Sequence, residues 1–168
     1  PAKRQSSARI FTCSVGDIFS PGAEREWLSA VIDVMRQMPR HTYQLLTKAP
    51  QHYVELDWPE NVWLGATATN QAQWDAARAG LAPLERDGRI TFVSAEPLLE
   101  PIAPDGWMPR WLIIGAQTGP GGRQPDGAWV GTLERAAARH GVPVFHKPNL
   151  VIRPRGRREF PVATPGPA

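Results

Sequence analysis

The chain has 168 residues, of which 42% are hydrophobic, and this size and composition fit one globular domain. The formal net charge is +3, and basic and acidic residues alternate along most of the chain, so composition permits nucleic-acid binding without indicating it. The single cysteine, Cys13, excludes an intrachain disulfide and a metal site built only from cysteines of this chain. No apolar run approaches the roughly 20 residues that span a bilayer, so we expect a soluble, cytoplasmic protein.

Six short apolar runs predict β-strands. They are rich in β-branched and aromatic residues, and longer, more polar segments separate most of them. In chain order the runs cover residues 9–15, 42–47, 61–67, 89–95, 111–116 and 142–147.

The segments between these runs predict helices. Residues 24–38 carry apolar side chains at spacings of three and four, and residues 51–56 favour a shorter helix. A helix over 71–86 has Asn70 as its N-cap, and one over 128–140 has Asp126 near its start and Gly141 as its C′ residue. Four prolines between residues 96 and 110 favour a loop there.

The alternation of strands and helices predicts an α/β fold with parallel strands joined by right-handed crossovers. Periodicity alone leaves open a barrel or an open doubly wound sheet. We expect an N-terminal extension over residues 1–8, the α/β domain over 9–150, and a basic, Pro/Gly-rich, mostly disordered tail over 151–168.

Polar residues follow the predicted strands, where the active sites of parallel α/β folds collect. Lys48, Glu96 and Lys147 each come directly after or at the end of an apolar strand, where an unpaired charge is costly. We therefore predict that the two ammonium groups and the carboxylate share one polar centre and act as the catalytic residues. A purely structural ion-pair network would give the same pattern.

The glycine-rich segment after the fifth strand suits an anionic ligand, because it offers backbone N–H groups and ends in Arg123. An ordinary turn is the alternative, since the glycine spacing matches neither a P-loop nor a dinucleotide-binding fingerprint. No metal-ligand set is predicted. The expected ligand-binding residues are Asp17, Thr47, Gln117, Thr118, Gly119, Gly121, Arg123 and His146.

Six ordered blocks of the sequence, within residues 9–148, resemble a phage- and prophage-associated family of unknown function described as radical S-adenosylmethionine-like. The most distinctive block is Val-Ser-Ala-Glu-Pro-Leu-Leu at 93–99. The other blocks are Phe-Thr-Cys-Ser-Val-Gly-Asp-Ile-Phe at 11–19, Tyr-Gln-Leu-Leu-Thr-Lys-Ala-Pro at 43–50, Asn-Val-Trp-Leu-Gly-Ala-Thr at 61–67, Gly-Ala-Gln-Thr-Gly-Pro-Gly-Gly-Arg at 115–123 and Val-Pro-Val-Phe-His-Lys at 142–147.

The resemblance implies a partial, TIM-barrel-like (β/α) barrel of about six strands, the carboxyl-terminal portion of a longer barrel. It further implies S-adenosylmethionine and a [4Fe–4S] cluster as cofactors of a full-length relative, held by cysteines in a preceding portion that this chain lacks. Two positions depart from the family pattern, with Gln117 in place of an acidic residue and His146 in place of an aromatic one. With one cysteine, this chain is not expected to hold the cluster by itself.

Two functional hypotheses follow. In the first, the chain is a fragment or shortened form of such a barrel that keeps the polar ligand site. In the second, it is a non-enzymatic module of the same fold that binds a protein partner, or nucleic acid through the basic segment 153–158. Either way, an open barrel edge favours self-association or a protein partner that covers it, and no membrane association is expected.

Overall fold

The computed structural model describes residues 3–14, 16–151 and 156–162. Six strands, three α-helices and one 3₁₀ helix make up the described fold, in which all six predicted strands are present and residues 96–110 form a loop. In chain order the elements are β1 (Arg9–Thr12), α1 (Arg25–Gln37), β2 (Thr42–Thr47), η1 (Pro50–Glu55), β3 (Val62–Thr67), α2 (Gln71–Arg86), β4 (Thr91–Ala95), β5 (Leu112–Ile114), α3 (Gly127–Arg139) and β6 (Val144–His146).

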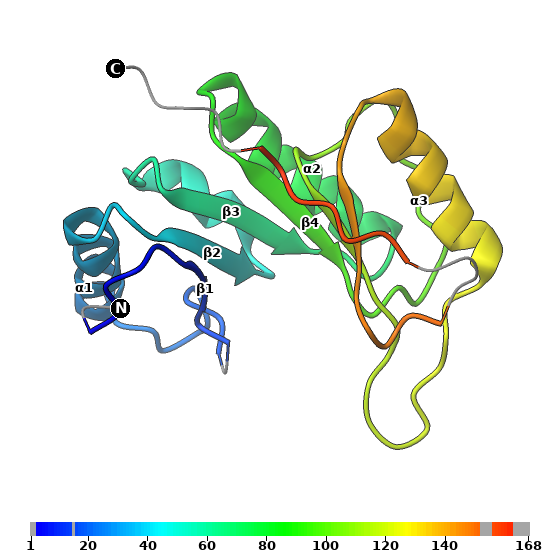
Figure 1. Ribbon diagram of the computed structural model, residues 1–168, viewed down its shortest axis with the longest axis horizontal. Coiled ribbons are helices and arrows are strands. Elements are labelled where there is room, and N and C mark those ends of the chain that lie inside the picture. Colours follow the sequence, from blue (N-terminus) through cyan, green and yellow to red (C-terminus); the bar gives the residue numbers. More distant parts are fainter. Residues whose placement is uncertain (1–2, 15, 152–155, 163–168) are drawn as a thin grey trace.

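The six strands form one parallel sheet in which the spatial order equals the chain order, β1 to β6. An open doubly wound sheet would reverse its strand order at a switch point, so this order decides between the two predicted architectures. The sheet curls into a half-barrel with the helices on its convex side (Figure 1). The prediction of an α/β parallel partial barrel is confirmed.

Helix boundaries follow the local signals in the sequence. The side chain of Asn70 accepts a hydrogen bond from the Gln73 N–H at 3.0 Å, and that of Asp126 accepts one from the Ala128 N–H at 2.7 Å, as N-caps do. Gly141, with φ of +65°, follows the C-cap of α3. None of the helices in the described part of the chain combines the length and apolarity needed to cross a membrane.

Alternation along each strand divides the apolar side chains into two layers. In β3, Val62, Leu64 and Ala66 belong to the larger core, which also contains buried side chains from all three α-helices. Trp63 lies on the opposite face, in a smaller cluster with Phe92, Trp111 and Ile113. The concave side of the half-barrel is therefore filled by aromatic side chains around Trp111.

The described part of the C-terminal segment, residues 156–162, lies across the concave side, and we name it the strap (Figure 1). It forms an antiparallel bridge to β6 at Phe145 and Arg158. The ring of Phe160 packs 5.2 Å from that of Trp111 and 3.7 Å from the guanidinium carbon of Arg9 in β1. The strap thus contacts both edge strands of the sheet. The sequence predicted a disordered tail here, and the rest of that tail, 152–155 and 163–168, lies outside the described residues.

Gly65 tests the packing of the concave side. A Cβ atom at this position would lie 2.2 Å from Cζ of Phe92, whose side chain is fully buried, so the ring has no room to retreat. We expect Gly65→Ala to lower the free energy of unfolding by about 1–3 kcal/mol through overpacking. Chemical denaturation measures this loss.

Gly127→Ala is the matched control, because a Cβ atom there meets nothing within 4 Å at the first position of α3. Its stability should stay within about 0.5 kcal/mol of the original protein. Equal stability of the two variants would contradict the packing described around Phe92.

Candidate functional site

The carboxylate of Glu96 and the ammonium of Lys147 form an ion pair at the carboxyl ends of β4 and β6. Lys147 Nζ lies 2.9 Å from Glu96 Oε2, and the side chains are 40% and 22% exposed, respectively. The sequence predicted that these two residues share one polar centre with Lys48, and the structure brings Glu96 and Lys147 together. Because both groups keep contact with solvent, a ligand can reach them.

The register of the sheet explains how residues on non-adjacent strands meet. Ala95, Ile114 and His146 are aligned across β4, β5 and β6, so the next row consists of Glu96, Gly115 and Lys147. Two strand spacings amount to about 10 Å, which the two long side chains span from opposite sides.

Gly115 leaves the space that this pair needs. A Cβ atom on Gly115 would lie 2.8 Å from Cδ, Cγ and Oε1 of Glu96, so the Glu96 side chain lies over the glycine of the middle strand. The backbone ladder continues through the row, since the Gly115 N–H donates to Ala95 O at 3.0 Å and the Lys147 N–H to Ile114 O at 2.9 Å. The pair is therefore held by ordered backbone on both sides.

Lys48 does not join this pair. Its ammonium makes no ion pair within the described residues, and the side chain is exposed. Thr47 aligns with Ala66 and Thr67 with Ser94, so the row of Lys48 meets β4 at Ser94, two residues below Glu96. Lys48 and Glu96 are thus separated by two strands laterally and two residues along the strand direction. The predicted centre of three charges is a centre of two.

Asp17 and Thr47 form a separate polar contact that joins the β1–α1 loop to the end of β2. The Asp17 carboxylate accepts hydrogen bonds from Thr47 Oγ1 at 2.7 Å, from the Lys48 N–H at 2.6 Å and from the Phe19 N–H at 3.0 Å. Thr47 Oγ1 in turn accepts one from the Ala49 N–H at 2.9 Å. Because these groups bond to one another, their visible role is to hold the loop.

The glycine-rich segment forms an exposed loop after β5. The Gln117 N–H donates to Arg123 O at 3.2 Å and the Gly122 N–H to Gly119 O at 3.0 Å, which closes a compact turn. Gly119 and Gly121 adopt φ values of +93° and +75°, a conformation that favours glycine. Gln117, Thr118 and Arg123 are exposed, so this part of the predicted site faces solvent.

Gln124 and Asn149 fix this loop to the segment after β6, a connection that the sequence analysis missed. Gln124 Nε2 donates to Asn149 O at 2.9 Å, and Asn149 Nδ2 donates to Ala116 O at 2.7 Å. No local pattern marks these amide side chains, because their partners are backbone groups distant in sequence. They hold the glycine loop beside Lys147.

Arg123 lines a small cavity whose lining does not include Glu96 or Lys147. The cavity, of about 330 Å³, lies between the segment after β4 and the start of α3. Its lining consists of Leu98, Leu99, Arg123, Gln124, Pro125, Asp126 and Trp129. The backbone links one wall of the cavity to the row of the pair, since the Leu98 N–H donates to Gly115 O at 3.0 Å.

His146 points away from this site. It aligns with Ile114, whose side chain is part of the larger core, and its ring lies 3.4 Å from Glu134 Oε1 of α3. The residue that precedes Lys147 therefore faces the helix layer while Lys147 faces the concave side. His146 is 2% exposed and does not line the predicted ligand site.

The residues present do not fit an iron–sulfur cluster. Cys13 is the single cysteine of the sequence, whereas a [4Fe–4S] cluster is held by several thiolates. Burial, together with the nearby Asp17 carboxylate, raises the pKa of the Cys13 thiol and so disfavours the thiolate. Among the described residues, no group of three or more His, Cys, Asp or Glu side chains is arranged to hold a metal ion.

The contacts of Asp17 predict a loss of stability on amide substitution. Asp17→Asn replaces one acceptor oxygen by a donor and removes the charge, so at least one of the three hydrogen bonds is lost. Hydrogen bonds to charged groups contribute about 1.5–3 kcal/mol, so we expect the free energy of unfolding to fall by about that amount. Chemical denaturation measures this change.

Asp87→Asn is the matched control, because the exposed Asp87 carboxylate makes no hydrogen bond within the described residues. It should leave the midpoint of denaturation unchanged. A variant of Asp17 as stable as this control would show that the loop does not depend on the carboxylate.

Comparison with known proteins identifies a family without assigning an activity. A family model described as a protein of unknown function, DUF5131, matches residues 1–150. No curated protein gives a significant match, and neither does any solved structure. The matched range includes every strand of the half-barrel and both members of the Glu96–Lys147 pair. The chain belongs to the DUF5131 family of proteins of unknown function.

Proposed function

We propose that the carboxyl end of this half-barrel binds a small zwitterionic ligand at the Glu96–Lys147 pair. The observation that carries the proposal is the ion pair itself, which spans β5 over Gly115 and remains partly exposed. A carboxylate and an ammonium held 2.9 Å apart can separate to bind a cationic and an anionic group of one molecule. Arg123, exposed on the loop after β5, is proposed to supply a second cation for the anionic end.

S-adenosylmethionine is the first ligand to test. Its α-amino group would pair with Glu96 and its carboxylate with Lys147 and Arg123, while its sulfonium would have no carboxylate partner among these three residues. The six sequence blocks that resemble the radical S-adenosylmethionine-like family support the choice, and so does the all-parallel half-barrel expected of such a relative. The relation to that family and its phage association are part of this proposal.

The proposed activity of this chain is ligand binding without cluster chemistry. When bound in a relative, a [4Fe–4S] cluster would supply the electron for cleavage of S-adenosylmethionine, but the donors found here do not fit that cluster. The residues of this chain would bind and orient the ligand through charge. The partial exposure of the Lys147 and Glu96 side chains is consistent with binding and release of a ligand.

The alternative, a nucleic-acid contact through the basic segment 153–158, has weaker support. Arg157 lies 3.8 Å from Glu134 and 3.6 Å from Glu159, and the guanidinium of Arg158 lies 5.1 Å from the ring centre of Phe145. These two arginines are engaged within the protein, which reduces their availability to phosphate groups. Residues 153–155 lie outside the described part of the chain.

A protein partner, if one covers the sheet, is proposed to bind at β1. The opposite edge strand, β6, is paired with the strap through the bridge at Phe145. Within the described residues β1 pairs only with β2, and Phe11 on β1 is 48% exposed. An unpaired edge with an exposed aromatic side chain favours strand pairing between chains.

Isothermal titration calorimetry with S-adenosylmethionine tests the proposed site. We expect the original protein to bind it and the Glu96→Gln and Lys147→Met variants to bind at least about tenfold more weakly, a change of about 1.4 kcal/mol. Because the pair is partly exposed, it contributes at most about 1 kcal/mol to folding, so both variants should remain folded.

Glu100→Gln is the matched control, since Glu100 is an exposed carboxylate a few residues beyond Glu96. It should bind like the original protein. Failure of the original protein to bind, or equal binding by the Glu96 and Glu100 variants, would refute the proposal.

Gly115→Ala offers an independent test that leaves both charges in place. The added methyl group would occupy the space of the Glu96 carboxylate and displace it from Lys147. We expect a loss of S-adenosylmethionine affinity comparable to that of Glu96→Gln, with circular dichroism unchanged because the displaced atoms belong to the end of a flexible side chain. Undiminished affinity would mean that the ligand does not need Glu96 in this position.

A further inference from the structure

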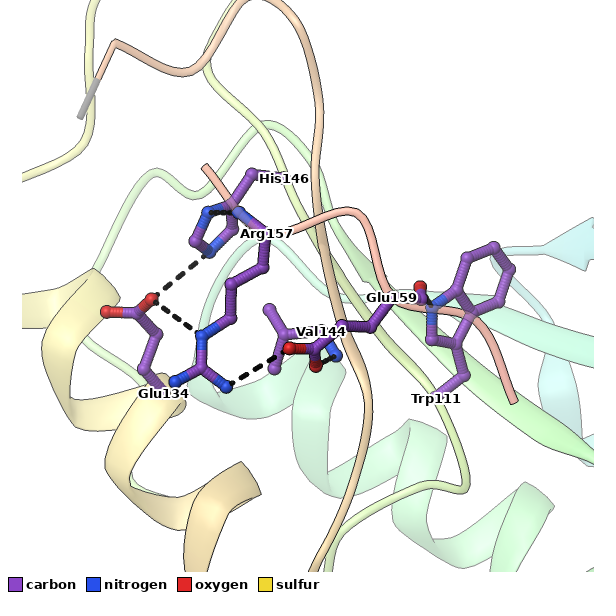
Figure 2. A network of polar contacts seen from close by, with 6 residues as sticks. All are labelled: Trp111, Glu134, Val144, His146, Arg157 and Glu159. Atoms are coloured by element: carbon purple, nitrogen blue, oxygen red, sulfur yellow. Dashed lines mark hydrogen bonds and ion pairs between the residues drawn. The ribbon is translucent and has the colours of Figure 1, made fainter. Parts of the chain in front are cut away.

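The strap is held to β6 by a buried histidine that accepts a hydrogen bond. The Arg157 N–H donates to His146 Nδ1 at 3.0 Å, and the His146 N–H donates to Arg157 O at 2.9 Å (Figure 2). An imidazole nitrogen can accept only when it carries no proton, so this contact requires the neutral ring with its hydrogen on Nε2. The backbone of the strap thereby selects one protonation state of His146.

Charged groups from two elements surround the ring. Glu134 of α3 places Oε1 at 3.4 Å from His146 Nε2, where the neutral tautomer carries its hydrogen. The strap contributes Arg157, whose Nε lies 3.8 Å from Glu134 Oε1, and Glu159 (Figure 2). Arg158 of the strap also acts on the ring. The histidine thus faces two carboxylates and two guanidinium groups, and their charges largely offset one another.

Burial decides the preference of the ring for the neutral form. His146 is 2% exposed, and desolvation lowers its pKa below the ordinary histidine value, with further lowering from Arg157 and Arg158. Glu134 and Glu159 act in the opposite direction and do not reverse the shift. The ring is therefore neutral when the strap is in place near neutral pH.

Glu159 fixes the next part of the strap. Its carboxylate accepts a hydrogen bond from the Val144 N–H at 2.9 Å, its N–H donates to Val144 O at 3.0 Å, and its carbonyl accepts one from Trp111 Nε1 at 3.0 Å (Figure 2). These contacts seat Phe160 against Trp111. Loss of the contact at His146 would remove one of the polar attachments of the strap and leave those of Glu159 and the packing of Phe160.

Gly156 completes the contact with the histidine. A Cβ atom at Gly156 would lie 2.9 Å from the Cβ atom of His146, which is fixed by β6 and cannot move aside. The strap therefore approaches β6 this closely only with glycine at that position.

We infer that the strap, residues 156–162, is a pH-sensitive latch over the concave side of the half-barrel, with His146 as its proton-binding group. Protonation places a hydrogen on Nδ1 opposite the Arg157 N–H, so a hydrogen bond becomes a contact between two donors, and it adds a positive charge beside Arg157 and Arg158. The latch is closed with a neutral ring and opens when the ring is charged.

The direction of the pH effect follows from linkage. Burial and the two arginines of the strap lower the pKa of His146 in the closed state, and opening would rehydrate the ring and remove those arginines, so the open state would bind the proton more readily. The stabilisation of the closed strap is complete above the ordinary histidine pKa of about 6.5 and is lost as the pH falls through the lower pKa of the closed state. Opening would expose the edge of β6 and the aromatic face around Trp111.

Hydrogen–deuterium exchange of the full chain tests the latch. After correction for the intrinsic pH dependence of exchange, protection of the strap amides should fall several-fold between about pH 7.5 and about pH 5.0. One proton limits the change to about thirtyfold over this range. Amides of β3 (Val62–Thr67) should keep their protection, because they lie in the centre of the sheet. An unchanged strap, or an equal loss of protection in β3, would overturn the inference.

Two variants separate the proton from the packing. His146→Asn keeps an acceptor near the position of Nδ1 but does not titrate, so its strap should stay protected at both pH values. Gly156→Ala should open the strap at both pH values by steric conflict with His146. His140→Asn, at the exposed C-cap of α3, is the matched control and should retain the pH dependence. The same pH dependence in the His146 variant as in the original protein would contradict the latch.

Discussion

The structure depends on one geometric constraint, the alternation of side chains in a parallel sheet whose strands follow chain order. Each strand sends every second side chain toward the helices and the others toward the concave side. At the carboxyl ends this rule separates neighbours in sequence: Thr47 faces outward and Lys48 inward, and His146 faces outward and Lys147 inward. Two polar systems therefore arise from His146, the last residue of β6, and from Lys147, which follows it: the first lies under the helix layer and the second at the strand end.

The first system joins Glu96 to Lys147 over Gly115, and it exists because the middle strand of the three has no side chain at that row. Charge attraction alone does not explain the geometry, since a partly exposed pair of this kind contributes little to folding. The fold determines the positions of the two charged groups, because backbone hydrogen bonds between the strands fix the main chain from which both side chains extend. Such placement suits recognition of a ligand with charges of both signs.

The sequence predicted much of the fold and part of the site. Strand and helix positions followed from apolar periodicity and from caps such as Asn70 and Asp126, which depend on local interactions. Glu96 and Lys147 were grouped because each follows an apolar strand, where an unpaired charge is costly, and the structure brings these two together. Lys48 was grouped with them wrongly, since the register that places it two residues below Glu96 depends on how the strands slide against one another. His146 was assigned to the ligand site from its strand position alone, although the alternation of side chains separates it from Lys147.

The strap was missed because its contacts, such as Phe160 with Trp111, join segments distant in sequence.

The central claim is that a ligand binds where Glu96 and Lys147 meet. Side-chain NMR during a titration with S-adenosylmethionine reports on both groups directly, through the carboxyl carbon of Glu96 and the ammonium nitrogen of Lys147. The account predicts that these two signals and the Gly115 amide shift together and saturate at the same ligand concentration. Shifts confined to other parts of the molecule, such as the cavity beside Cys13 and Trp27, would contradict it.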